Sequence, residues 1–189
     1  AMFRGMVRDA SAGYRGTQGL SDRENIVKII GLTGSIGMGK TTVASQFEAL
    51  GAKICSADGI VHALLDKDAD VIAQIKQVFP QVIENGKINR AALGKIVFSD
   101  TSKRLQLEAI LHPRVQAVEN DFIEKNRALG TKLVVLDIPL LFETGGEKRC
   151  DITVVASAPA FIQRWRVMKR SGMTKEKFRA ILKNQMLDK

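Results

Sequence analysis

A glycine-rich stretch directly after an apolar run constrains this chain more than any other feature. Residues 34–41 read GSIGMGKT and fit the pattern GxxxxGK[ST]. The run before it, IVKIIGLTG, is apolar and β-branched, as is typical of a buried parallel strand, and the residues after it have helical periodicity as far as Leu50. A strand, a tight loop and a helix in this order predict a phosphate-binding loop within an α/β fold.

The residue types of this loop suit the phosphates of a nucleoside triphosphate. At Gly34, Gly37 and Gly39 a side chain would block the close approach of the backbone to phosphate oxygens, or forbid the backbone angles. Lys40 is expected to bridge the β- and γ-phosphates, and the Thr41 hydroxyl to bind Mg²⁺. The alternative is a chance glycine-rich turn, which the flanking strand and helix argue against.

Apolar runs alternate with helical patterns along the rest of the chain, which predicts a mostly parallel sheet. Further strands are expected at 52–58, 132–142 and 151–158. Between the second and third strands the sequence predicts a long helical insert, in which Pro113 occupies the start of a helix. Residues 159–189 are expected to form a helix, a polar turn and a second helix.

The net charge of +9 is concentrated near the end of the chain. Residues 1–28 carry +2, residues 29–159 carry fifteen basic and fifteen acidic side chains, and residues 160–189 carry nine basic against two acidic. Such a local excess suits a single anion better than a general coat for nucleic acid or an anionic membrane. No apolar stretch reaches the roughly 20 residues that cross a bilayer.

The two cysteines indicate a reducing compartment, and the first residues indicate a leader. Cys55 and Cys150 have neither CxxC nor metal-ligand spacing, so buried free thiols are expected. Residues 1–25 are rich in Arg, Gly and Ser and lack the apolar core of a secretory signal, which predicts a flexible leader. A transit peptide is the alternative, against which Asp9, Asp22 and Glu24 speak.

Two carboxylates are expected at the C-terminal edge of the sheet. Asp58 ends the predicted strand 52–58, where it could orient the proton of an attacking hydroxyl; capping of the next helix is the alternative, and both roles can coexist. Asp137 closes the run LVVLD and could reach Mg²⁺ through a water molecule, with simple packing as the alternative. Glu143 is a further candidate.

Basic side chains and the two histidines supply the other candidates. Arg166 and Arg170 lie four residues apart and are expected on one helix face, where two guanidinium groups can clamp a transferring phosphoryl group. A solvated surface is the alternative for any single one of them. His112 and Arg114 fall in the helical insert, where they could hydrogen-bond an acceptor, although each histidine alone is more often structural.

Five segments in this order and spacing resemble the dephospho-CoA kinase family: GSIGMGKTT, SADGIVH, LHPRV, DIPLLFE and QRWRVMKRSGMT, covering about Ile29 to Met186. The loop alone is generic, whereas the set together is specific. The resemblance implies ATP-dependent phosphorylation of the ribose 3′-hydroxyl of dephospho-CoA, the last step of coenzyme A synthesis. It also implies a three-layer P-loop kinase fold with a helical CoA-binding cap and a mobile lid.

The resemblance carries over to individual residues. It implies catalytic roles for Asp58, Lys40, Arg166 and Arg170, and Mg²⁺ binding by Thr41 and Asp137. It implies contacts with dephospho-CoA for His62, His112 and Arg114, and ATP binding by Gly34, Gly37, Met38, Gly39, Lys40, Thr41 and Thr42. The corresponding domains are a leader at 1–25, a nucleotide-binding core at 26–58 and 130–160, a cap at 59–129 and a basic lid at 161–189.

This sequence departs from the family pattern at two places. Ser56 stands where many members have the first Asp of a DAD triplet, which leaves Asp58 as the only carboxylate there. The family usually continues through a final strand and helix after the position of Lys189, so we expect that strand to be missing and ATP binding or stability to be weaker.

Several other classes of P-loop protein are alternatives to this interpretation. A GTPase is disfavoured because no NKxD-type segment follows a later strand. Another P-loop nucleotide or small-molecule kinase is the first alternative, and a regulatory nucleic-acid-binding ATPase that uses the basic C-terminal segment is the second. We expect a cytoplasmic protein, a monomer, with ATP and dephospho-CoA as ligands and without nucleic acid or membrane as partners.

Overall fold

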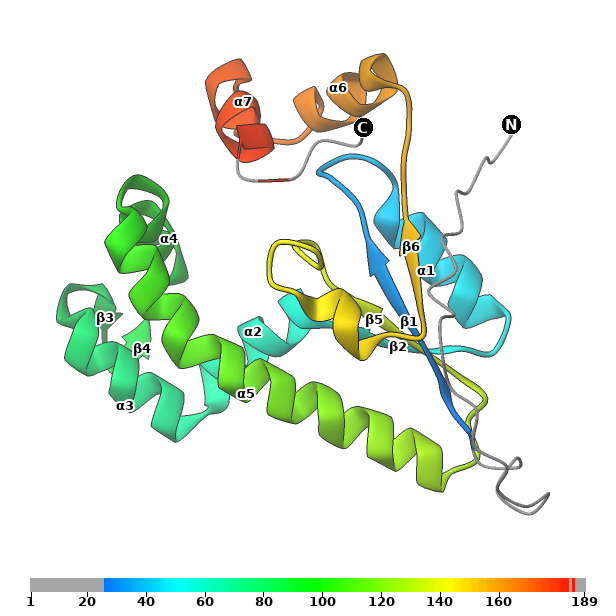
Figure 1. Ribbon diagram of the computed structural model, residues 1–189. Helices are drawn as coiled ribbons and strands as arrows, with labels where there is room; N and C mark the ends of the chain where they lie inside the picture. Colours follow the sequence, from blue (N-terminus) through cyan, green and yellow to red (C-terminus); the bar gives the residue numbers. More distant parts are fainter. Residues whose placement is uncertain (1–25, 184, 186–189) are drawn as a thin grey trace. The chain divides into compact units, whose positions relative to one another are not determined.

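The computed structural model describes residues 26–183 and 185 (Figure 1). The predicted leader, and residues 184 and 186–189 of the predicted lid, lie outside the described residues. The described residues divide into two compact units, one formed by those up to residue 55 together with those from residue 123 onward, and the other by residues 56–122.

A four-stranded sheet forms the centre of the first unit. Its strands are β1 (Lys28–Thr33), β2 (Lys53–Ser56), β5 (Leu133–Asp137) and β6 (Ile152–Val155), in the order β2-β5-β1-β6. The central strand β1 runs parallel to both neighbours, with Ile30 opposite Val135 and Leu32 opposite Val154. The prediction of an α/β fold with a mostly parallel sheet is therefore confirmed.

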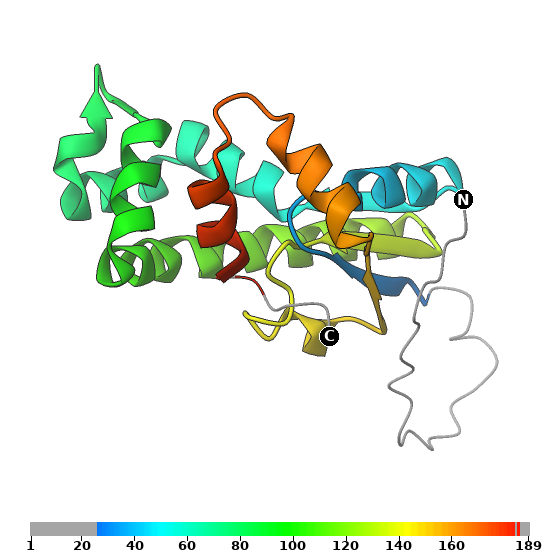
Figure 2. The same cartoon turned by 90° about the horizontal axis from the view of Figure 1, so that it is seen from above.

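Burial explains why these segments are strands. Leu32, Val134, Val135 and Leu136 are fully buried, as expected for the inner strands of a parallel sheet covered on both faces. Helix α1 (Lys40–Ala49) packs against β1 and β5 and lies along the sheet in both views (Figures 1 and 2). It ends at the predicted stop, where Gly51 adopts a φ of 93°.

The second unit is mainly helical. It contains α2 (Ala57–Lys67), α3 (Ala69–Val78), the short helix η2 (Pro80–Val82), the hairpin β3 (Ile83–Glu84) and β4 (Lys87–Ile88), α4 (Arg90–Ser99) and the first part of α5 (Thr101–Ala128). Its core is built on side chains that are completely buried: Val71, Ile75, Phe79 and Val82. Such a core is large enough to hold several short helices in place.

Side-chain caps define where these helices begin. Asp68 accepts a hydrogen bond from the backbone N–H of Val71 at 2.9 Å, and Asn89 accepts one from Ala92 at 3.0 Å. Each cap satisfies an N–H that has no partner within the helix.

Three sequence predictions about elements are wrong. Helix α5 continues through Pro113, although a helix start was expected there. Leu111 before the proline and Val115 after it pack into the same core, which offsets the backbone hydrogen bond that proline cannot make. Strand β5 ends at Asp137, so the following IPLLF segment forms turns, and β2 ends at Ser56.

The first unit also carries η3 (Gly146–Arg149) and two helices near the end of the chain, α6 (Ala160–Met168) and α7 (Lys175–Lys183). Within the described part of the chain, no helix is both long enough and apolar enough to cross a membrane.

Candidate active site

The predicted phosphate-binding loop lies between β1 and α1, and its glycines occupy positions that side chains would obstruct. Gly37 has a φ of 78°, and a Cβ atom there would lie 2.5 Å from Cγ2 of Val167. At Gly34, φ is 149° and a Cβ atom would lie 2.5 Å from the carbonyl oxygen of Ala156. The loop is therefore held closely between the end of β6 and α6 because it has no side chains at these points.

The loop leads into a helix terminus without a side-chain cap. Gly39 is the N-cap residue of α1 and makes no side-chain capping bond, while Thr41 and Thr42 are exposed in the first turn. Met38 folds back, since its N–H donates to the carbonyl of Ser35 at 3.1 Å and its sulfur accepts from the N–H of Ala158 at 3.2 Å. The first amides of α1 thus present the positive end of the helix dipole to an anion.

Helix α6 contacts the other side of the loop. Gln163 is buried, and its Nε2 donates to the carbonyl of Ile36 at 2.9 Å and to the hydroxyl of Ser35 at 3.2 Å. Arg166 donates through Nη1 to the carbonyl of Gly37 at 3.4 Å. The same helix therefore fixes the loop backbone and brings a guanidinium group to it.

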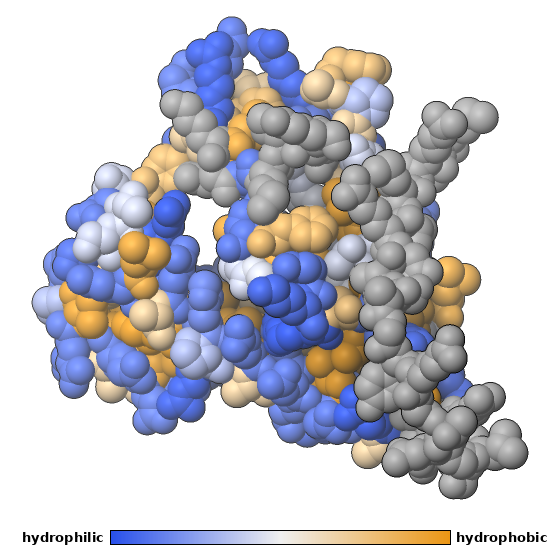
Figure 3. Space-filling view, viewed as in Figure 1, coloured by the Kyte–Doolittle hydropathy of each residue, from blue (hydrophilic) through white to orange (hydrophobic). Residues whose placement is uncertain are grey.

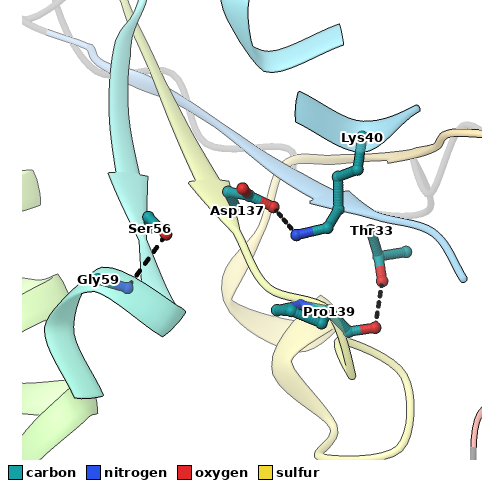
Figure 4. A network of polar contacts seen from close by, with 6 residues as sticks. All are labelled: Thr33, Lys40, Ser56, Gly59, Asp137 and Pro139. Atoms are coloured by element: carbon teal, nitrogen blue, oxygen red, sulfur yellow. Dashed lines mark hydrogen bonds and ion pairs between the residues drawn. The ribbon is translucent and has the colours of Figure 1, made fainter. Parts of the chain in front are cut away.

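Lys40 and Asp137 form an ion pair at the carboxyl end of β5 (Figure 4). Both side chains are largely buried, with 17% and 16% of their surfaces exposed. Nearby, the Thr33 hydroxyl donates to the carbonyl of Pro139 at 3.1 Å, which ties the end of β1 to the turn after β5. The ends of the two strands are thus fixed to each other, and the lysine lies beside the carboxylate that the sequence assigns to Mg²⁺.

The donor set at this place suits magnesium better than a transition metal. Among residues 26–183 and 185, no group of three or more His, Cys, Asp or Glu side chains could hold a metal ion by itself. Mg²⁺ is commonly held by one or two protein oxygens together with phosphate oxygens and water. The Thr41 hydroxyl and the Asp137 carboxylate are oxygen donors of that kind, and so they fit the predicted ion.

Asp58 lies in the first turn of α2, because β2 ends two residues before it. The expectation that it ends a strand is wrong, because Ser56 is both the last residue of β2 and the N-cap of α2, accepting from the N–H of Gly59 at 3.2 Å (Figure 4). Asp58 is exposed, as is His62 one turn further on. Its carboxylate is consequently free of the capping role that was its alternative.

The other residues predicted to contact dephospho-CoA lie on α5. His112 is exposed, and Arg114 donates through Nη2 to a carboxylate oxygen of Asp70 at 2.6 Å. This ion pair joins α5 to the first turn of α3, and 41% of the Arg114 side chain remains exposed. The structure therefore places His112 and Arg114 two residues apart within one turn of a long helix, in the unit formed by residues 56–122.

The prediction that Arg166 and Arg170 share a helix face is wrong. Helix α6 ends at Met168, and the N–H of Arg170 donates to the carbonyl of Val167 in the turn that follows. Arg170 is exposed, whereas Arg166 reaches the loop. Gly172, with a φ of 71°, then turns the chain toward α7.

The outer face of α6 is partly hydrophobic, as Figure 3 shows at the top of the view. Phe161 and Trp165 are exposed on this helix, and the Nζ of Lys169 lies 3.8 Å from the centre of the Trp165 ring.

In α7 the pKa of Glu176 is lowered, mainly by a hydrogen bond from the backbone and to a smaller extent by one from Thr174. This carboxylate lies at the beginning of the helix, where a negative charge is favourable.

Comparisons with known proteins agree on one family. The family model for dephospho-CoA kinase matches residues 28–189. A dephospho-CoA kinase of Paramagnetospirillum magneticum is 51% identical over 162 residues, which are 86% of this chain and 76% of that protein. One from Bartonella quintana is also 51% identical over 162 residues, covering 83% of its length. The chain belongs to the dephospho-CoA kinase family.

Solved structures support the same conclusion. The crystal structure of TT1252 from Thermus thermophilus matches with a TM-score of 0.73 and 37% identity, over 85% of this chain and 81% of the other. A dephospho-CoA kinase from Campylobacter jejuni matches with a TM-score of 0.53 and 26% identity, over 82% and 78%. The resemblance inferred from five sequence segments is thereby confirmed, and with it the P-loop kinase fold.

Sequence reasoning missed two glutamines that contact the loop. Gln163 donates to Ile36 and Ser35, and the side-chain oxygen of Gln185 accepts from the Ser35 hydroxyl at 2.7 Å and from the N–H of Ile36 at 3.0 Å. A signal for Gln163 was present: it lies four residues before Val167 on the buried stripe of α6, where an amide side chain requires partners. No comparable periodic signal marks Gln185.

Proposed function

We propose that this chain transfers the γ-phosphoryl group of ATP to the ribose 3′-hydroxyl of dephospho-CoA, with Mg²⁺ as the metal ion. The observation that supports this most directly is the phosphate-binding loop, with the Lys40–Asp137 pair beside it, in a member of the dephospho-CoA kinase family. The loop amides and the first turn of α1, from Gly37 to Thr42, would hold the triphosphate.

Charge neutralisation is the main task of the residues around the phosphates. Lys40 exchanges Asp137 for phosphate oxygens of ATP, and Asp137 then becomes available to the metal shell. Thr41 and Asp137 would hold Mg²⁺, which when bound would supply charge neutralisation to the phosphates. Arg166, already at the loop, is placed to stabilise the charge that spreads over the transferring group.

In the transfer step the 3′-oxygen forms a bond to the γ-phosphorus while the bond from that phosphorus to the bridging oxygen of ADP breaks. Asp58 orients the hydroxyl and accepts its proton. The exposed position of Asp58 in the first turn of α2 supports this role, since its carboxylate is not used to cap the helix. His62, His112 and Arg114 would bind the phosphates and amides of dephospho-CoA, and Arg170 would complete the cationic lid.

A coupled assay of ADP release, with and without dephospho-CoA, tests the function. We expect ADP release to depend on dephospho-CoA and on Mg²⁺, and coenzyme A to appear in equal amount. Adenosine, AMP and other nucleotides serve as matched acceptors that lack the pantetheine arm. Equal rates with those acceptors would favour another nucleotide or small-molecule kinase, and release independent of any acceptor would contradict the proposal.

We also propose that the protein is a cytoplasmic monomer whose basic C-terminal segment serves ATP instead of nucleic acid. The balance of fifteen basic and fifteen acidic residues over 29–159 supports the part of this proposal that concerns nucleic acid, because a nucleic-acid-binding body would carry an excess of basic residues. Gel filtration, together with titration of labelled single-stranded and double-stranded DNA at low salt, tests it. A dimer, or DNA binding that falls steeply with salt, would contradict it.

A further inference from the structure

The backbone N–H and carbonyl of Ile36 are both held by glutamines that come from the C-terminal part of the chain. The carbonyl accepts from Gln163 at 2.9 Å, and the N–H donates to Gln185 at 3.0 Å. The Ser35 hydroxyl joins the two, since it accepts from Gln163 at 3.2 Å and donates to Gln185 at 2.7 Å. Two amide side chains and one hydroxyl therefore form a continuous set of hydrogen bonds over the start of the loop.

This set is built into the structure. Gln163 is only 6% exposed, and both N–H groups of its amide can be used in the two bonds that it donates. A buried amide that lost these acceptors would leave its own donors and the Ile36 carbonyl unsatisfied, which is unfavourable. Val167, fully buried one turn later, contacts the open side of Gly37. Helix α6 can therefore leave the loop only by giving up several contacts at once.

We propose that Gln163 is a positioning residue, which joins the helix carrying Arg166 to the phosphate-binding loop so that both are ordered together. Gln163 does not touch the reacting atoms. It fixes the direction of the peptide between Ile36 and Gly37, and so the direction of the amides from Gly37 onward. Since Arg166 lies three residues after Gln163 on α6 and contacts Gly37, the same helix position sets the loop and the arginine. The inference rests on the proposed function only in that the loop binds ATP.

A double-mutant cycle on ATP affinity tests this proposal. Gln163→Met keeps the length of the side chain but removes both donated hydrogen bonds. We expect it to weaken Mg²⁺-ATP binding about tenfold, measured by calorimetry, because the Ile36 carbonyl is left without a donor. Arg166→Ala should also weaken binding, but should add little in the Gln163→Met background, because the arginine is already misplaced there. The proposal would be overturned if the double variant lost ATP affinity by the product of the two single factors, which would mean that the residues act independently. An unchanged ATP affinity of Gln163→Met would overturn it as well.

Controls separate positioning from a loss of folding. Gln46→Met makes the same chemical change on the exposed surface of α1 and should leave ATP affinity unaltered. The KM for dephospho-CoA of Gln163→Met should stay within twofold of the unsubstituted chain, whereas a general structural defect would raise both KM values and contradict the proposal. If Gln163→Met does not fold, Ser35→Ala is the second variant, because it removes the hydroxyl between the two glutamines without altering α6. It should weaken ATP binding about threefold, the loss expected for neutral hydrogen bonds. An unaltered ATP affinity of Ser35→Ala would again overturn the proposal.

The experiment also distinguishes this proposal from the proposed function. Binding of ATP is measured without an acceptor, so the cycle can be completed even if dephospho-CoA is not phosphorylated. In that case the proposed function fails while the affinities still decide whether Gln163 positions the loop.

Discussion

The ammonium group of Lys40 and the carboxylate of Asp137 pair with each other at the end of β5, where both are largely buried. Because both side chains are shielded from water, the positive charge of Lys40 and the negative charge of Asp137 compensate each other. Removal of either side chain would leave the other as an unpaired charge at a buried position. Phosphate oxygens can replace the carboxylate beside the lysine, and a hydrated metal ion can replace the lysine beside the carboxylate. The pair therefore places next to each other two groups for which we propose separate tasks.

Substitution of either partner is expected to impair turnover in a different way. Lys40→Met should lower kcat about 100-fold or more and weaken ATP binding, because the phosphates lose a buried cation. Asp137→Asn should lower kcat by a similar factor but should also raise the Mg²⁺ concentration needed for half-maximal activity. A titration of activity against Mg²⁺ for both variants checks this difference.

The matched control for this pair is Asp151→Asn. Asp151 also pairs with a lysine, Lys28, at 3.4 Å, but the two side chains are 38% and 59% exposed. Exposed pairs contribute little, about 0 to 1 kcal/mol, so turnover and its Mg²⁺ dependence should not change. A loss of activity in Asp151→Asn as large as that in Asp137→Asn would contradict the assignment.

Asp58→Asn should lower turnover far more than ATP affinity. The substitution keeps the size of the side chain but removes the group that we propose takes the proton, for which a loss of about 10²- to 10⁴-fold in kcat is usual. Asp66→Asn, on the same helix and equally exposed, is the control. Near-normal turnover of dephospho-CoA by Asp58→Asn, measured on protein whose melting temperature is unchanged, would remove Asp58 from the mechanism.

The two arginines of the basic segment are expected to differ in importance. Arg166 contacts Gly37 and should, when replaced by Ala, lower kcat more than Arg170→Ala does, since a cation already near the loop requires less reorganisation. Arg164→Ala, an exposed neighbour on α6, should be close to neutral. Steady-state kinetics of the three variants rank them, and a larger loss for Arg164 than for Arg166 would contradict the order.

The phosphate-binding loop and the sheet could be predicted because their signals are local. Glycines at fixed offsets and a continuous β-branched run require only the neighbouring residues to be recognised. The continuation of α5 through Pro113 could not be predicted, because it depends on Leu111 and Val115 packing into a core made by α2, α3 and α4. Local propensity favoured a break there, and tertiary packing overrode it.

Within the candidate site the sequence identified the charged groups but not what holds them. The pairing of Lys40 with Asp137 joins residues 97 positions apart, and the bonds of Gln163 to the loop span more than 120. Contacts at such separations follow from the order of strands in the sheet, which spacing along the chain does not encode. The boundary of α2 was misplaced for a simpler reason, since Ser56 serves both as the end of a strand and as a cap.

Arg114 and Asp70 provide the sharpest test of how dephospho-CoA is bound. Their hydrogen bond is short at 2.6 Å, but 41% and 73% of the two side chains are exposed, so the pair contributes at most about 1 kcal/mol and a substrate phosphate can displace the carboxylate. Arg114→Ala should therefore raise the KM for dephospho-CoA about tenfold, the loss of one charge-assisted hydrogen bond, and leave the KM for ATP unaltered. Asp70→Asn should have the opposite effect and lower the KM for dephospho-CoA, because Arg114 no longer has a competing partner. If both variants change only the melting temperature, the arginine serves to join α3 to α5 and does not bind substrate.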